Sequence, residues 1–398
     1  MRIILLIIFV VLLQSGPAFG DTQPAAADSP AAEAGPQAEF GGLAAILRQG
    51  SLAELERALT LGLDVNLADG PDGLTPLMVA AASNTDPAVV NLLVERGAEL
   101  EARETRYGLT PLMFAASFNQ GPVVTALIQA GAKVDQRDNR GGTAVYHAAA
   151  NNRNPGVIYL LAEAGADLEL GDQSRRTPLM QAAGAGNMQA LRMLVQLKVR
   201  LDNADNHGRT ALQVAAVETD AASVIEGLAK AGADLEAKDQ EGLTPLLAAA
   251  AGNVNLPVME ALKEAGADLK AVDARGADAL LLACLSNPNV EIIKYLVRNG
   301  ADLNTPRANG LTPLLAAAGN VESEVAKFLI LSGADVSAKD PQGRNSLTLA
   351  VWLNPNDEVA RILVNGGVSP TEKDAQGRTP VDYAGDQRPE LVQFLQRK

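Results

Sequence analysis

The segment Gly-Leu-Thr-Pro-Leu occurs four times in this chain, at residues 73–77, 108–112, 242–246 and 310–314. Related five-residue segments fill the intervals between these copies and continue to residue 381. The third residues of the ten segments follow one another at spacings of 33 to 35: Thr75, Thr110, Thr143, Thr177, Thr210, Thr244, Asp278, Thr312, Asn345 and Thr379. Ten copies in register indicate an internal repeat, so we expect stacked units and not separate globular domains.

Each unit predicts two short helices joined by a loop. A Thr, Asp or Asn side chain accepts hydrogen bonds from first-turn N–H groups, and Pro fits the first helical position. The Leu and the Ala pair that follow form an apolar face that a neighbouring helix can approach closely. A second amphipathic segment, such as residues 290–300, ends in Gly, which suits a left-handed cap. A Gly-Ala-Asp segment and an Asp-x-x-Gly turn then lead to the next unit.

Two helices and a turn at a period near 33 residues are typical of ankyrin repeats, and residues 40–398 resemble that family. The resemblance implies an all-α repeat solenoid of about eleven stacked units, curved, with a concave binding face. Residues 40–69 would form the N-terminal cap, 70–373 nine internal repeats, and 374–398 the C-terminal cap. The family usually has His directly after Thr-Pro-Leu, but this chain has other residues there. We therefore expect apolar packing to replace most of the inter-repeat hydrogen bonds that this His makes in the family.

Residues 1–20 have the features of a secretory signal peptide. Arg2 supplies a positive charge, residues 3–13 are apolar without interruption, and Ala18-Phe19-Gly20 is a small-x-small cleavage site. The alternative is an uncleaved anchor, but spanning a bilayer takes about 20 apolar residues. Residues 21–39 are rich in Ala, Pro and acidic residues, which predicts a flexible spacer. We expect an exported protein, periplasmic or secreted, that does not insert in the membrane after cleavage.

The composition restricts the classes of function. The formal net charge of −14 argues against a nucleic-acid binder, which should present a basic surface. A single Cys excludes an intramolecular disulfide, and two His leave little for metal or acid–base chemistry. No nucleophile, phosphate-loop or zinc motif is present. We therefore expect a non-enzymatic protein without cofactor or metal, with Cys284 as a packed apolar group and His147 in a structural or surface role.

The resemblance places partner binding on the concave side, which the turn tips and the exposed ends of the first helices form in this family. Basic tips recur in this acidic chain, and interface hot spots favour Trp, Tyr and Arg. The predicted partner-binding residues are Tyr107, Phe118, Arg176, His207, Arg209, Arg344 and Trp352. The alternative is that the tip arginines pair with the acids of the Asp-x-x-Gly turns and serve only solubility and stability.

Three hypotheses for function follow. The first is a monomeric, exported scaffold that binds another protein, in the periplasm of a bacterium; the lack of disulfides and of Asn-x-Ser/Thr sequons favours that origin. The second is a secreted, host-directed effector or a toxin-neutralising module with the same fold. The third is a cryptic enzyme. The sequence does not identify the partner.

Overall fold

The computed structural model of this chain describes residues 46–48, 51–62, 64–68, 72–320, 322–385 and 388–397. The predicted signal peptide at 1–20 and the spacer at 21–39 lie outside these residues, as do residues 40–45 of the predicted N-terminal cap. Within the described residues, no helix is long and apolar enough to span a membrane.

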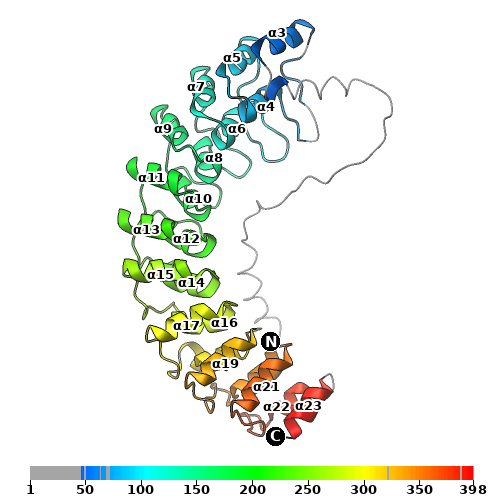
Figure 1. Cartoon of the computed structure of the whole chain (residues 1–398), viewed down its shortest axis with the longest axis vertical. Helices are drawn as coiled ribbons and strands as arrows, with labels where there is room; N and C mark the ends of the chain where they lie inside the picture. Colours follow the sequence, from blue (N-terminus) through cyan, green and yellow to red (C-terminus); the bar gives the residue numbers. More distant parts are fainter. Residues whose placement is uncertain are drawn as a thin grey trace, which may run out of the picture. The chain divides into compact units, whose positions relative to one another are not determined.

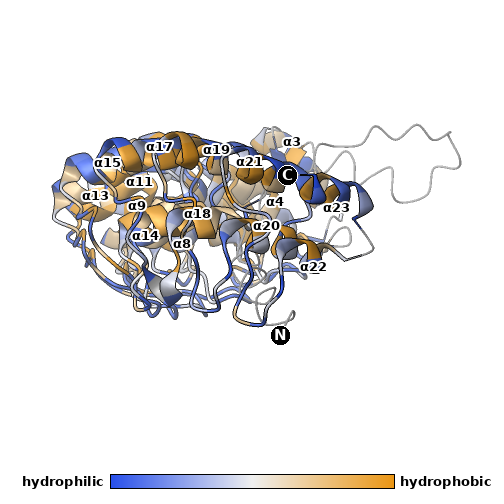
Figure 2. Cartoon of the chain, turned by 90° about the horizontal axis from the view of Figure 1, so that it is seen from below, coloured by the Kyte–Doolittle hydropathy of each residue, from blue (hydrophilic) through white to orange (hydrophobic). Residues whose placement is uncertain are grey.

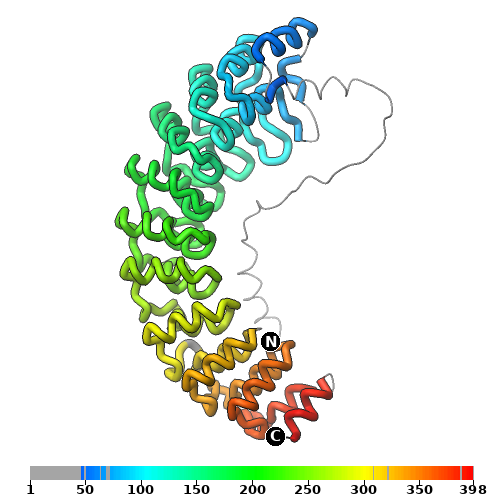
Figure 3. The backbone as a smooth tube through the Cα atoms, viewed as in Figure 1, coloured from blue at the N-terminus to red at the C-terminus, as the bar shows by residue number. Residues whose placement is uncertain are grey.

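Ten helix pairs follow helix α3 in the described part of the chain, which is consistent with about eleven stacked units. In chain order the helices are α3 (Leu52–Thr60), α4 (Pro76–Ser83), α5 (Pro87–Glu95), α6 (Pro111–Phe118), α7 (Gly121–Gln129), α8 (Ala144–Asn151), α9 (Gly156–Glu163), α10 (Pro178–Gly184), α11 (Met188–Gln196), α12 (Ala211–Glu218), α13 (Ala222–Ala231), α14 (Pro245–Gly252), α15 (Leu256–Ala265), α16 (Ala279–Ser286), α17 (Val290–Arg298), η1 (Ala308–Gly310), α18 (Pro313–Ala317), α19 (Ser323–Leu331), α20 (Ser346–Leu353), α21 (Asp357–Asn365), α22 (Pro380–Ala384) and α23 (Pro389–Gln396). Figure 1 and Figure 3 show the pairs side by side in a curved stack. The predicted solenoid is confirmed.

The first helix of each unit begins as the repeat predicts. Oγ1 of Thr244 accepts from the backbone N–H of Leu247 at 3.4 Å, and Pro245 occupies the first helical position. The carboxylate of Asp278 and the amide oxygen of Asn345 accept the equivalent bonds at 2.9 Å each. The three residue types are therefore interchangeable here because each presents an oxygen to the same first-turn donor.

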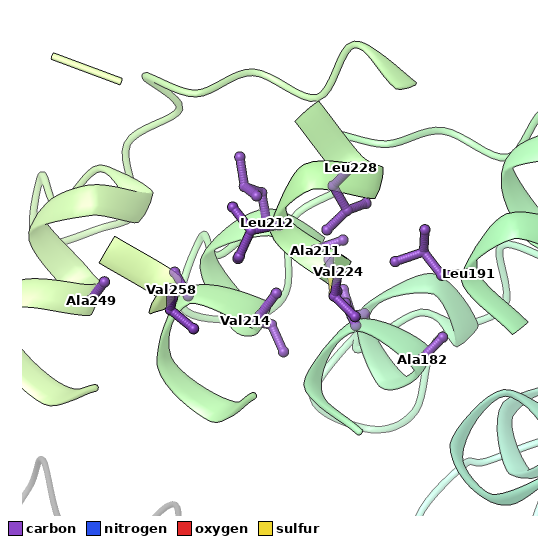
Figure 4. Packing of buried hydrophobic residues seen from close by; sticks show 14 of the residues in the cluster. Ala182, Leu191, Ala211, Leu212, Val214, Val224, Leu228, Ala249 and Val258 are labelled. Atoms are coloured by element: carbon purple, nitrogen blue, oxygen red, sulfur yellow. The ribbon is translucent and has the colours of Figure 1, made fainter. Parts of the chain in front are cut away.

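Leu, Val and Ala form one continuous core between the two layers of helices. In Figure 4, Leu212 and Val214 of α12 lie close to Val224 and Leu228 of α13. All four side chains are fully buried, and burial of each such Leu contributes about 1.5–3 kcal/mol. Cys284 lies in this core as a free thiol, which confirms its packing role.

A ladder of asparagines, all buried except the half-buried Asn187, links successive units. Nδ2 of Asn119 donates to the carbonyls of Ala81 and Asn84 in the preceding unit, both at 2.7 Å. The same pair of bonds recurs from each of these residues: Asn152, Asn187, Asn253, Asn287, Asn320 and Asn354. Each amide satisfies carbonyls left open at the end of a neighbouring helix, so the ladder couples units through buried polar groups.

The ladder has one internal interruption and one distinct end. Thr219 stands where an Asn would continue the series, and its side chain accepts from the backbone N–H of Ala221 in its own unit. At the C-terminal end, Nη1 of Arg388 donates to the carbonyls of Val351 and Asn354 at 2.8 and 3.1 Å.

The turns between units project to one side of the helix layers, where Figure 2 shows mostly hydrophilic residues. Oδ1 of Asp172 accepts from the backbone N–H groups of Ser174 and Arg176, which closes the turn. Neighbouring turns are joined by backbone bonds, such as Gln173 N–H to the carbonyl of Arg140 at 2.8 Å. The tips are therefore held in order by local and inter-unit bonds.

The position after Thr-Pro-Leu is filled mainly by buried apolar side chains such as Met113 and Leu247, as predicted. Gln213 is an exception, since its Nε2 donates to the carbonyls of Ala237 and Leu243 in the next unit. Its amide thus makes inter-repeat hydrogen bonds at the position where the family usually has His.

Glycine with positive φ follows most second helices, as the sequence predicts. Lys198 takes this place after α11 with φ of 61°. Arg175 likewise replaces the Gly of its turn, also with φ of 61°. A side chain is disfavoured in this left-handed region, so both positions are strained.

Candidate interaction surface

The first helices, from α4 to α16, line the inner side of the curved stack (Figure 1). The seven predicted partner-binding residues all lie on turn tips or first helices. Tyr107 and His207 are on tips, and Phe118 and Trp352 lie in the last turns of α6 and α20. The structure separates them into three groups along the stack, with His207 beside the central group and Phe118 apart from all three.

The central group is an ion-paired cluster. Nη1 and Nη2 of Arg176 donate to Oε1 and Oε2 of Glu218 at 3.1 and 2.7 Å, across 42 residues of sequence. Gly184 makes room for this pair, because a Cβ there would lie 2.6 Å from Oε2 of Glu218. Arg209 reaches the same carboxylate at 4.0 Å and pairs with Asp205 at 2.8 Å.

Burial alone would lower the pKa of Arg176, but the hydrogen bonds and charge of Glu218 outweigh it and raise that pKa. Burial, with the charge of Asp172, raises the pKa of the nearby Tyr146 phenol well above its usual range. Its hydroxyl donates to Oδ2 of Asp172 at 3.0 Å. At neutral pH the Arg176 guanidinium is therefore charged and the Tyr146 phenol is neutral.

The C-terminal group alternates guanidinium groups and aromatic rings. The Arg344 guanidinium lies 4.8 Å from the centre of the Trp352 ring, and that of Arg378 lies 4.4 Å from the Tyr383 ring. The two rings are 6.1 Å apart. Oδ2 of Asp374 accepts from the Tyr383 hydroxyl at 2.5 Å. Although burial raises the pKa of Asp374, this bond and the backbone bonds of its turn lower it to about 2.

The N-terminal group is centred on Tyr107. Two guanidinium groups lie over its ring, that of Arg106 at 5.1 Å and that of Arg140 at 5.3 Å from the ring centre. The turn that presents Tyr107, residues 104–109, is one residue longer than turns such as 138–142. Glu104 replaces the usual Asp and its carboxylate accepts from the backbone N–H groups of Arg106 and Tyr107.

Phe118 and His207 are exposed; the Phe118 ring makes no stacking or cation–π contact with these groups among the described residues, whereas His207 lies on the same turn as Asp205 of the central group. Phe118 is 63% exposed although it is a large apolar side chain. His207 is held by its backbone N–H, which donates to Oδ1 of Asp205 at 2.8 Å. The other histidine, His147, lies 2.7 Å from Oδ2 of Asp138, so its contacts agree with the structural role predicted for it.

The alternative prediction, that tip arginines pair with the acids of their own turns, is confirmed for three residues. Arg209, Arg344 and Arg378 pair with Asp205, Asp340 and Asp374. Arg176 instead pairs with Glu218 of the next unit. These arginine side chains remain 17–50% exposed, so pairing holds them in place without removing them from solvent.

Sequence reasoning missed Tyr383, which contacts both Trp352 and Arg378. The available signal was its position four residues after Thr379, which matches that of Phe114 and His147 in their own units. Two of these residues, His147 and Tyr383, contact the acids of their own turns, Asp138 and Asp374.

In the ranges that the structure describes, no group of three or more His, Cys, Asp or Glu side chains is arranged to hold a metal ion. The three groups described above consist of guanidinium groups, aromatic rings and carboxylates that pair with them. Such groups recognise other molecules by stacking and by charge-assisted hydrogen bonds.

Comparison with known proteins gives a family match over nearly the whole described region. The family described as ankyrin repeats (3 copies) matches residues 43–138, 104–172, 145–239, 216–307, 246–340, 287–374 and 314–398. No curated protein matches the chain. The solved ankyrin repeat domain of human ASB11 is 23% identical with a TM-score of 0.51, and 56% of this chain covers 97% of it. That of Bcl-3, a member of the IkappaB family, is 29% identical with a TM-score of 0.46, over 56% and 98% of the two chains.

Proposed function

We propose that this chain, which belongs to the ankyrin-repeat family, is an exported, non-enzymatic scaffold that binds another protein on the concave side of its stack. Ankyrin repeat domains generally mediate protein–protein interaction, and their fold is typically a non-enzymatic module. The partner, the export and the use of this particular surface belong to the proposal.

The observation that supports concave-face binding is the ordering of the arginine and aromatic side chains there. Arg176 is fixed by Glu218, and Arg344 is fixed between Asp340 and the ring of Trp352. Side chains that are ordered before binding lose less conformational entropy when a partner arrives. Arg, Tyr and Trp are also the residue types that dominate binding energy at protein interfaces.

Export is proposed from the features of residues 1–20, and the periplasm of a bacterium is the proposed destination. Fractionation of cells that produce the full chain with a C-terminal tag tests this directly. We expect the mature protein in the periplasmic extract with Asp21 as its first residue. Mature protein in the culture medium would favour the secreted alternative, and an unprocessed chain in the cytoplasm would refute export.

Site-specific photo-crosslinking in the producing cells tests the binding surface. A photoreactive amino acid replaces Phe118 or Trp352 on the concave side. The matched control position is Tyr159 of α9, an aromatic residue of the outer layer that is 45% exposed. We expect one discrete crosslinked protein from the concave positions and none from Tyr159. Equal crosslinking at all three positions would contradict a concave binding face.

A further inference from the structure

We propose that Arg106, Tyr107 and Arg140 form a clamp that binds an acidic segment of a partner protein through its carboxylates. This inference rests on the proposed function, since it names the chemistry of the partner at one end of the concave side. It depends on three independent features of the turn tips in the second and third units.

The first feature concerns which tip arginines are already paired with a carboxylate of this chain. Arg176, Arg209, Arg344 and Arg378 each have a carboxylate partner in the structure. Arg106 and Arg140 are exposed, and no side-chain carboxylate lies within ion-pair distance of either among the residues that the structure describes; what is seen is their approach to one ring. In a chain with net charge −14, Arg106 and Arg140 differ from other exposed tip arginines such as Arg275 because both approach one ring from adjacent tips, an arrangement that folding does not require.

The second feature is proximity. Both guanidinium carbons lie within 5.3 Å of the same ring centre, so they cannot be farther apart than twice that distance. Each planar guanidinium group can bind a carboxylate with two parallel hydrogen bonds. Two carboxylates on neighbouring or alternate residues of an extended segment would therefore meet both groups at once.

The third feature is the way in which the tip is built. The turn of residues 104–109 has one residue more than turns such as 138–142, and it presents Tyr107 with both guanidinium groups over its ring. The longer acid Glu104 is buried and binds the turn backbone where Asp would otherwise do so. Asn139 N–H donates to the Tyr107 carbonyl at 2.8 Å, which fixes the two tips relative to each other.

The surroundings of the clamp favour a short segment with carboxylates over a phosphate polymer as its ligand. The net acidity of the chain repels a long polyanion, whereas a short acidic segment feels mainly charges within about 10 Å. The Tyr107 ring also offers an apolar contact to the aliphatic part of a Glu side chain.

Fluorescence anisotropy with a labelled peptide of alternating Glu and Gly residues, and with its Gln counterpart, tests the clamp on the full mature chain. We expect the Glu peptide to bind, the Gln peptide to bind at least tenfold more weakly, and added salt to weaken binding. The variant R106Q/R140Q should lose about tenfold or more in affinity. The matched control R275Q changes an exposed arginine on a distant tip and should leave binding unchanged.

Equal binding of the two peptides, equal loss in R275Q, or tighter binding of a 12-nucleotide DNA strand would overturn the proposal. Unchanged thermal melting of R106Q/R140Q establishes that the loss is local. If crosslinking at Phe118 and Trp352 still captures a partner in R106Q/R140Q while the peptides show no preference, the clamp is refuted and the scaffold function stands. If wild-type chain captures no partner at all, the proposed function itself fails.

Discussion

Two neighbouring parts of the stack differ in how closely they follow the repeat pattern at the left-handed backbone positions and in the asparagine ladder. Residues 239–287, the regular segment, have Gly242 and Gly266 at their left-handed positions. Residues 172–219, the irregular segment, have Arg175 and Lys198 at the equivalent places. The regular segment contributes two rungs to the asparagine ladder, whereas the irregular segment ends on Thr219, where the ladder is interrupted.

The irregular segment also contains the pair of Arg176 with Glu218, whose counterparts in the regular segment are Leu243 and Ser286. Departures from the repeat pattern and the charged cluster thus occur together. Residues that break local rules tend to accumulate where a surface serves something other than stability. A solenoid tolerates this because its stability is a sum over neighbouring units, so a weak unit is supported by regular ones.

The substitution Leu246→Ala in the regular segment should have the largest effect. This side chain is fully buried in α14, and its truncation should cost about 2–5 kcal/mol. Because the regular segment joins the two ends of the stack, the truncation of Leu246 should also split unfolding into two steps. Chemical denaturation followed by circular dichroism measures both effects. A single transition with almost no shift would show that the regular segment does not couple the ends.

The substitution Asn253→Ala should cost about 1–3 kcal/mol, because the carbonyls of Ala216 and Thr219 lose their buried donor. Thr219→Ala is the matched control at the interruption of the ladder, where the side chain makes no bond to a neighbouring unit in the structure. We expect a clearly smaller loss in urea denaturation for the control. Equal losses would mean that the ladder adds nothing beyond local turn bonds.

The substitution Arg176→Met should cost about 1–3 kcal/mol, since the Glu218 carboxylate, 13% exposed, loses two charge-assisted donors. The double variant Arg176→Met/Glu218→Leu removes both charges and should recover most of the loss. A thermal-melting cycle of the two single variants and the double variant measures the coupling. Additive losses would show that the pair is not energetically linked.

The smallest effect concerns the strained backbone positions. Lys198→Gly should stabilise the irregular segment by about 0.5–1 kcal/mol, because relief of left-handed strain exceeds the added chain entropy. The reverse change, Gly266→Lys, should destabilise the regular segment by a similar amount. No atom lies within 4 Å of a Cβ at Gly266, so only the backbone is tested. Thermal melting of both variants measures these changes. Melting temperatures that shift in the same direction for the two variants would contradict this explanation.

Much of the fold could be predicted because the residues that specify each helix and turn act on backbone groups only a few positions away. The cap at Thr244, the Pro at position 245 and the Gly at 266 each act on residues only a few places away. The two substituted caps, Asp278 and Asn345, followed from the same chemistry. Because the same caps and turns recur in ten units, the sequence leaves little doubt about which segments form helices and where they begin and end.

The candidate site could be predicted only in part. Spacing placed the seven residues on tips and first helices, yet it did not show that Arg176 pairs with a carboxylate of the next unit. It also did not separate paired arginines from Arg106 and Arg140, which share the ring of Tyr107. Those distinctions depend on side chains from different units.

The sequence by itself determined the period, the helix caps, the turns and membership of the ankyrin-repeat family, because each depends on interactions within a few residues. Only the tertiary structure decided the asparagine ladder, the contact of Trp352 with Tyr383 and the grouping of arginines. These contacts join residues roughly one unit apart in sequence. Their formation depends on how closely successive units pack and how each is rotated against the next, which no local pattern specifies.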